Sequence, residues 1–154
     1  MLGFHSNTFS ASGSDFGDWI SPEDGRSRNI PRKREIPRVL VVDDEELIAD
    51  TLTEILKRNG FNAMGTYSGK QALQIARRFP PDYLLADVLM PFMNGVELAI
   101  QIREMSAKTR ILLFSGHANS ADLLDEARMT GHDFDVVAKP IHPDRLLHIL
   151  RDKR

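Results

Sequence analysis

A short apolar run ends abruptly in two carboxylates at Arg38-Val39-Leu40-Val41-Val42-Asp43-Asp44. Three further runs end in the same way: Tyr83-Leu84-Leu85-Ala86 before Asp87, Ile111-Leu112-Leu113-Phe114 before Ser115, and Val136-Val137-Ala138 before Lys139. Apolar runs of this length that are bounded by polar residues are typical of buried parallel strands, whose carboxyl ends lie along one edge of the sheet. Ligand sites of open α/β sheets lie at that edge. We therefore expect three carboxylates, a hydroxyl and an amine to converge on one cleft.

Strand-like and helix-like segments alternate from about residue 36 onward. A weak second strand is expected over residues 61–67, and helical periodicity predicts helices over residues 45–58, 68–79, 96–105 and 122–129 and from Pro143 onward. Five such repeats predict an α/β fold with a single doubly wound, five-stranded parallel sheet in the order 2-1-3-4-5, flanked by five helices. Its switch point would lie between strands 1 and 3, which carry Asp43, Asp44 and Asp87.

The composition excludes several classes of protein. Without any cysteine, the chain has no disulfides, thiolate metal sites or cysteine nucleophiles. The net charge of −2 does not favour nucleic acid or anionic membrane as a partner. No apolar stretch reaches the roughly 18 residues that a membrane span requires. Because no secretory signal is evident at the N-terminus, a cytoplasmic location is expected.

Residues 1–35 differ in composition from the rest of the chain. They are dominated by Ser, Gly, Asn, Asp and Pro and show no sustained period, so we expect a disordered N-terminal tail. The tail ends in a basic run between Arg26 and Arg34, which we interpret as a solvated linker rather than a contact with phosphate or an acidic partner. DNA binding through this tail is the weakest of the functional hypotheses. The expected folded domain then spans residues 36–154.

Three neighbouring carboxylates repel one another unless a cation joins them. Mg²⁺ suits such a site, because it prefers oxygen ligands and is commonly held by one or two carboxylates and a phosphate. No histidine lies beside these aspartates in the sequence and there is no thiol, which argues against zinc. A carboxylate beside Mg²⁺ can attack a phosphoryl donor, while Lys139 and Ser115 pair with the phosphoryl oxygens.

Four motifs, taken in their order along the chain, resemble those of a known family. They are Val41-Val42-Asp43-Asp44, Asp87-Val88-Leu89-Met90-Pro91 with Gly95, Phe114-Ser115-Gly116, and Lys139-Pro140. From about residue 36 to its C-terminus, the chain resembles the receiver domain of two-component response regulators, of which the chemotaxis regulator is the simplest example. Each motif alone is weak, but the ordered set on the expected strands is specific.

The resemblance implies a phosphoacceptor and a magnesium site. Asp87 would accept a phosphoryl group from a histidine kinase or phosphotransfer protein. Asp44 would ligate Mg²⁺ directly and Asp43 mostly through water, with Asp87 and the backbone carbonyl of Leu89 completing the protein ligands. Leu89 and His117 occupy positions that tune the lifetime of the phosphate in relatives, and an apolar Leu89 favours slower hydrolysis.

The resemblance also assigns the phosphoryl-binding residues and exposes one departure. Ser115 and Lys139 would hold the phosphoryl group, and the Lys139-Pro140 bond would be cis. Relatives carry a switch aromatic three residues before the lysine, where this chain has Val136. Phe134 would point to the same face of a strand and is a weak candidate to replace it.

We expect a stand-alone, Mg²⁺-dependent switch of a phosphorelay, not a turnover enzyme, that changes its affinity for a downstream protein. A homodimer is compatible with the sequence. The alternative is an interaction module that keeps the fold and signals without phosphate, which Val136 makes plausible. A third class, the haloacid dehalogenase type of hydrolase, requires Asp-x-Asp after the first strand, and Asp43-Asp44-Glu45 does not supply it.

Overall fold

The computed structural model describes residues 35–116 and 119–152. Strands and helices alternate along these residues in the order β1 (Arg38–Val42), α2 (Glu46–Arg58), β2 (Asn62–Thr66), α3 (Gly69–Arg78), β3 (Tyr83–Asp87), α4 (Gly95–Met105), β4 (Arg110–Ser115), α5 (Ser120–Met129), β5 (Asp135–Ala138) and α6 (Pro143–Asp152). The predicted tail up to residue 34, and His117, lie outside the described residues. Among the described helices, none combines the length and the apolar character of a membrane span.

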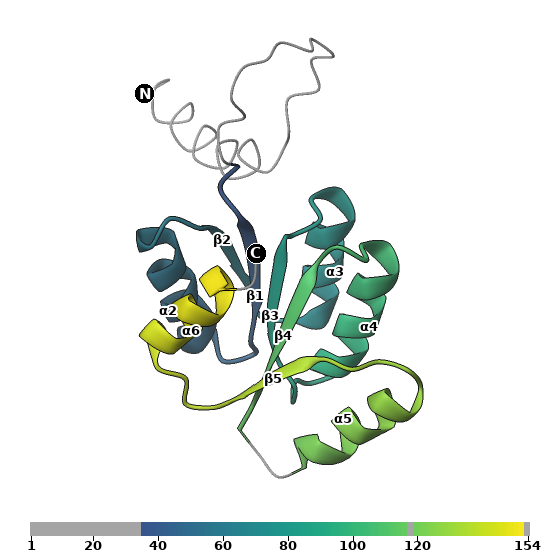
Figure 1. The fold of residues 1–154 in the computed structure, drawn as a ribbon. Helices are drawn as coiled ribbons and strands as arrows, with labels where there is room; N and C mark the ends of the chain where they lie inside the picture. Colours follow the sequence, from purple (N-terminus) through teal and green to yellow (C-terminus); the bar gives the residue numbers. More distant parts are fainter. Residues whose placement is uncertain (1–34, 117–118, 153–154) are drawn as a thin grey trace, which may run out of the picture. The chain divides into compact units, whose positions relative to one another are not determined.

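The strands within the described residues form one parallel, five-stranded sheet in the order β2-β1-β3-β4-β5 (Figure 1), which confirms the predicted order. The register sets Val42 of β1 opposite Ala86 of β3, and Asp87 opposite Phe114 of β4. The carboxyl ends of β1, β3 and β4 are therefore aligned at one edge. Because β2 and β3 lie on opposite sides of β1, the loops after β1 and β3 diverge there and leave room for a site.

Local side-chain contacts explain where several helices begin and end. The Ser68 hydroxyl accepts a hydrogen bond from the Gln71 backbone N–H (3.2 Å) and caps α3. Asn94 caps α4 by accepting from the Glu97 backbone N–H (2.9 Å). Helix α2 ends before Gly60, whose φ of +89° is a left-handed conformation that glycine adopts without steric cost. Each of these boundaries follows from a residue type that the sequence displays.

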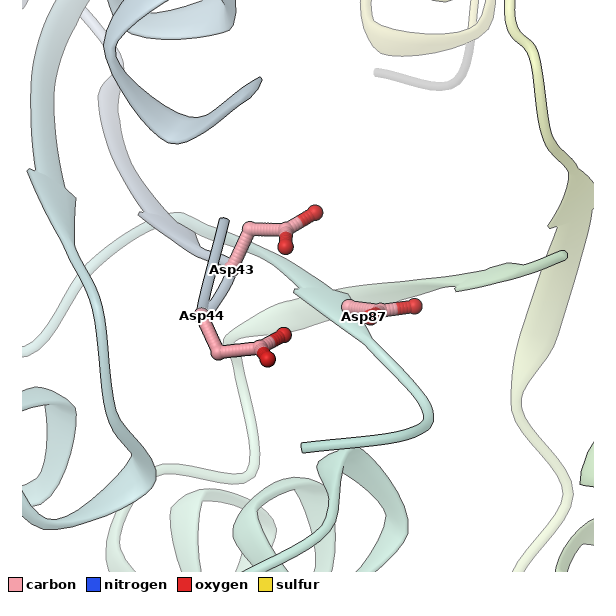
Figure 2. A group of neighbouring side chains, drawn as sticks. All are labelled: Asp43, Asp44 and Asp87. Carbon is pink, nitrogen blue, oxygen red and sulfur yellow. The ribbon is translucent and has the colours of Figure 1, made fainter. Parts of the chain in front are cut away.

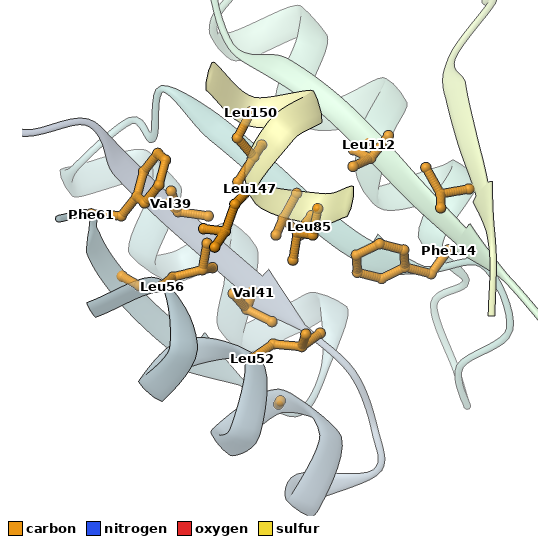
Figure 3. Packing of buried hydrophobic residues seen from close by; sticks show 14 residues of the cluster. Val39, Val41, Leu52, Leu56, Phe61, Leu85, Leu112, Phe114, Leu147 and Leu150 are labelled. Atoms are coloured by element: carbon orange, nitrogen blue, oxygen red, sulfur yellow. The ribbon is translucent and has the colours of Figure 1, made fainter. Parts of the chain in front are cut away.

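The sheet is buried on both faces, which accounts for its apolar strands. Val39 and Val41 of β1 face α2 and α6 and belong to the main apolar cluster (Figure 3). The cluster comprises Val39, Val41, Ala49, Leu52, Leu56, Phe61, Ala63, Leu85, Leu112, Phe114, Val137, Leu146, Leu147 and Leu150. Leu40 and Val42, which alternate with them, are equally buried, and helices α3 and α4 cover the opposite face (Figure 1).

Helix α5 is less deeply embedded than its neighbours. It contacts α4, and Ser120 and Ala127 are its buried residues. Helix α6, by contrast, buries three leucines. Since buried apolar area provides most of the packing free energy, α5 is held by much less of it than α6.

Candidate functional site

Backbone and side-chain hydrogen bonds fix the first carboxylate at the end of β1. The Asp43 backbone N–H donates to the Thr66 carbonyl (3.2 Å), which extends the pairing with β2 by one residue. One carboxylate oxygen of Asp43, Oδ1, accepts from the Glu45 backbone N–H (3.0 Å). This local turn orients the side chain just before α2 begins.

The structure brings Asp43, Asp44 and Asp87 together where β1 and β3 end (Figure 2). One carboxylate oxygen from each residue lies within 4.8 Å of the other two. Asp43 is 1% exposed, the Asp87 side chain is 13% exposed, and Asp44 lies exposed at the mouth of the site. The cluster therefore consists of one buried carboxylate, one that is largely buried and a third that is exposed to solvent.

Lys139 supplies the positive charge of this site from the end of β5. Its Nζ lies 2.7 Å from Oδ2 of Asp43 and 3.4 Å from Oδ1 of Asp87. The Lys139 backbone N–H donates to the Ser115 carbonyl (2.9 Å), which fixes the start of the side chain beside β4. The Lys139-Pro140 bond is cis, as the resemblance implied. One ammonium thus bridges two carboxylates that come from different strands.

The excess of negative charge in the site affects the pKa values of Asp87 and Lys139. Burial raises the pKa of the Asp87 carboxyl above its usual value; Lys139 opposes this shift, while the Asp43 and Asp44 carboxylates add to it. Burial alone would lower the pKa of the Lys139 ammonium. Its hydrogen bond to Asp43 and the charges of Asp43 and Asp87 outweigh that effect, so the pKa of Lys139 is raised. The site thus strongly favours an added positive charge.

The loop after β3 is held close to the phosphoacceptor candidate. The Gly95 backbone N–H donates to the Val88 carbonyl (2.8 Å), and a Cβ at position 95 would lie only 2.1 Å from the Asp87 carbonyl oxygen. Only glycine fits this approach. Leu89 lies within this closed loop, two residues past Asp87. The role of its carbonyl as a metal ligand stays a prediction.

Ser115, the last residue of β4, lies in register with Ala138, directly before Lys139. Its hydroxyl forms a hydrogen bond with the hydroxyl of Ser120, the first residue of α5. Ser120 was not among the residues predicted for the site. The available signal was a second hydroxyl five residues after Ser115, at the start of the next helix, but a serine there is ordinarily interpreted as a helix cap.

Phe134 does not take the place of the absent switch aromatic. Its side chain is 6% exposed, stacks on His132 and lies beneath the Arg103 guanidinium, 5.2 Å from the ring centre. It precedes β5, at the opposite end of that strand from Lys139. Val136, at the usual aromatic position, is 38% exposed. The suggested substitution by Phe134 is therefore not supported by its position.

The three carboxylates fit a magnesium ion. At Mg–O distances of about 2.1 Å, ligand oxygens on opposite sides of an octahedral ion lie about 4.2 Å apart. The observed separations of up to 4.8 Å need only a small side-chain movement to match. Both Asp43 oxygens already accept hydrogen bonds, from Lys139 and from the Glu45 N–H, whereas Asp44 is exposed. This difference supports direct ligation by Asp44 and a water-mediated role for Asp43.

Comparisons with known proteins agree with this geometry. The sequence profile of the response regulator receiver domain matches residues 39–151. The chain is 29% identical to the chemotaxis protein CheY of Bacillus subtilis over 114 residues, covering 73% of this chain and 93% of the relative. It is 32% identical to the cell cycle response regulator CtrA of Brucella ovis over 111 residues, covering 71% of this chain and 47% of that protein. The structure of the Vibrio cholerae chemotaxis protein CheY4 is similar with a TM-score of 0.67, at 28% identity, covering 76% of this chain and 98% of that one.

The chain therefore belongs to the response regulator receiver family of two-component systems. Members of this family are signalling switches rather than turnover enzymes, and phosphorylation and magnesium binding at an acidic pocket are typical of them. The matched region makes up nearly all of CheY but about half of CtrA. Relatives thus include receivers with and without a large additional part.

Proposed function

We propose that this protein is a phosphorylation-dependent switch of a phosphorelay, in which Asp87 accepts a phosphoryl group from a phosphohistidine of a histidine kinase or phosphotransfer protein. The observation that carries the proposal is the joint placement of Asp43, Asp44 and Asp87 around the Lys139 ammonium. A surface carboxylate cluster would not explain why Asp43 is buried and why the Asp87 side chain is only 13% exposed. The cost of burying them is offset in part by the Lys139 ammonium and would be offset further by a divalent cation.

The proposed step is a simple phosphoryl transfer. An Asp87 carboxylate oxygen attacks the phosphorus, and the phosphorus–nitrogen bond to the donor histidine breaks. The bonding electron pair stays on the imidazole nitrogen, and the product is an acyl phosphate on Asp87. Lys139 already lies 3.4 Å from an Asp87 oxygen, so its ammonium can pair with a phosphoryl oxygen without a large movement.

Asp43, Asp44, Asp87 and the Leu89 carbonyl would hold Mg²⁺ during this reaction. When bound, the ion supplies positive charge that neutralises the oxygens of the phosphoryl group. The Ser115 hydroxyl would donate a hydrogen bond to one of those oxygens. Modification would then change affinity for a downstream protein only through contacts that differ between the two states, and a second copy of the chain would be one candidate for such a partner.

Incubation with acetyl phosphate and Mg²⁺ tests the proposal directly. Intact-mass spectra of the wild type should show a gain of about 80 Da for one phosphoryl group, and EDTA should prevent it. Asp87→Asn should remain unmodified. Asp152→Asn removes an exposed carboxylate from the last turn of α6, at the end of the helix that is remote from Lys139, and should be modified like the wild type. Equal modification of Asp87→Asn and wild type would refute the assignment.

The second candidate, a phosphate-independent interaction module, is favoured by one observation, the exposed Val136 at the position of the switch aromatic. It predicts an unmodified wild type under the same conditions, with magnesium present and donor in excess. A single phosphoryl group on Asp87, without repeated turnover of the donor, supports the phosphorelay switch instead.

A further inference from the structure

Helix α5 begins differently from α3 and α4. At the start of α3 and α4, Ser68 and Asn94 accept hydrogen bonds from backbone N–H groups of the first turn. Asn119, the corresponding residue of α5, makes no such side-chain bond. The first residue of the helix, Ser120, is instead 2% exposed and directs its hydroxyl to Ser115 of β4. The first residue of α5 is thus hydrogen-bonded to the sheet, and the Asn119 side chain does not cap the helix.

The hydrogen bond joins Ser120 to Ser115, a residue of the proposed phosphorylation site. Ser115 is the last residue of β4, and its carbonyl accepts the Lys139 backbone N–H. Ser120 and Ala127 are the buried residues of α5, and Leu123 and Leu124 are only partly buried, so little apolar packing resists a small movement of the helix. A weakly packed helix bonded to a residue of the site is suited to respond to events there.

This chain lacks the aromatic residue of β5 through which relatives transmit phosphorylation. Val136 carries no ring, and Phe134 is held between His132 and Arg103 at the far end of the strand. Any response to phosphorylation must therefore leave the site through other contacts. The hydroxyl pair Ser115–Ser120 is a direct connection of this kind.

We propose that Ser120 is the positioning residue that couples phosphorylation of Asp87 to a movement of α5. A hydroxyl has one proton to donate and two lone pairs to accept. When the Ser115 hydroxyl donates to a phosphoryl oxygen, its bond to Ser120 persists only with Ser120 as the donor. Ser120 then follows Ser115 toward Asp87 and draws the first turn of α5 with it. This inference rests on the proposed function.

Hydrogen exchange of α5 tests the coupling. Wild type and variants are treated with acetyl phosphate and Mg²⁺, and intact mass confirms the addition of one phosphoryl group, which the Asp87→Asn variant assigns to Asp87. Amide exchange of residues 120–129 is then compared with the untreated protein. In the wild type we expect the exchange rates of the first turn to change by about fivefold, the factor that one hydrogen bond supplies. In Ser120→Ala this ratio should fall to near one, although Asp87 is still modified.

Three further variants separate coupling from general destabilisation. Ser120→Thr keeps the hydroxyl and should retain the response. Thr130→Ala removes a hydroxyl from the other end of α5, where it donates to the Ala127 carbonyl (2.9 Å), and should also retain it. If Ser120→Ala fails to fold, Ser120→Cys, which is similar in size and only a weak donor, should lose the response in its place.

The outcomes are distinct. A modified Ser120→Ala protein whose α5 responds like the wild type overturns the role of Ser120, as does a modified wild type in which α5 does not respond. In either case the proposed function stands. An unmodified wild type overturns both, and the mass spectrum alone reveals it.

Discussion

Replacing Lys139 by methionine would remove the only positive charge that the described structure brings into contact with the buried carboxylates Asp43 and Asp87. Methionine preserves much of the side-chain length but carries no charge. The ammonium–carboxylate distances of 2.7 and 3.4 Å correspond to gross attractions of about 6 and about 5 kcal/mol at an effective dielectric constant near 20. Much of this is cancelled by the desolvation of Lys139, which the variant no longer requires.

The net loss should resemble that of breaking a buried ion pair, about 3–5 kcal/mol, and lie at the lower end because the Lys139 side chain is 20% exposed. Urea denaturation in EDTA at pH 7, followed by far-UV circular dichroism, measures the free energy of unfolding. Lys57→Met, on the exposed side of α2, is the matched control and should change it by less than about 0.5 kcal/mol. A Lys139→Met protein as stable as this control would refute the reasoning.

The same variant has a defined pH dependence. The pKa of Asp87 is raised in the folded state, so the folded protein binds more protons than the unfolded chain, and the Asp87 contribution to stability improves as pH falls through that raised value. Without Lys139, which opposes the shift, the effect grows. The stability deficit of Lys139→Met should therefore shrink between pH 7 and pH 4. A deficit that widens on acidification would contradict this sign.

Three further changes have defined outcomes. Mg²⁺ at about 100 times its dissociation constant should raise the free energy of unfolding of the wild type by about 2.7 kcal/mol. The same concentration should raise the free energy of unfolding of Asp87→Asn much less. Equal increases for the two proteins in urea titrations would count against the magnesium site. Phe92→Asn should stabilise the protein by about 1 kcal/mol in thermal unfolding, since Phe92 is fully exposed and has a φ of 67°; lower stability would contradict this. Gly95→Ala should lower stability by about 1–3 kcal/mol and slow acetyl phosphate labelling, because its Cβ meets the Asp87 carbonyl; wild-type labelling would show that the loop adapts.

The strand order and the acidic cluster were accessible from sequence because both depend on local pattern and on general rules of topology. Apolar runs such as Val39–Val42 identify strands that are buried on both faces, and right-handed crossovers leave few ways to order them. Once β1 and β3 are neighbours, residues that follow their last buried positions must lie close together. The proximity of Asp43 and Asp87 could therefore be predicted from the strand order alone.

Contacts between elements that are distant in the sequence were not accessible in the same way. The sequence pattern predicted that α5 begins at Asp122, but the helix starts at Ser120, since the hydroxyl of that residue bonds to β4 rather than within the helix. The position of Phe134 beneath Arg103 likewise depends on how the end of α4 meets the start of β5. Residue patterns along one element do not encode such pairings.

The apolar cluster that joins β1 and α2 to α6 has a consequence for the nascent chain. Val39 and Leu56 are synthesised early, yet Leu146, Leu147 and Leu150 cover that face of the sheet. The Tyr83 hydroxyl also donates to the Leu150 carbonyl (3.0 Å). During translation, the part of this face that α6 covers therefore stays open to water and to chaperones until α6 has left the ribosome, whereas the face covered by α3 and α4 can close sooner.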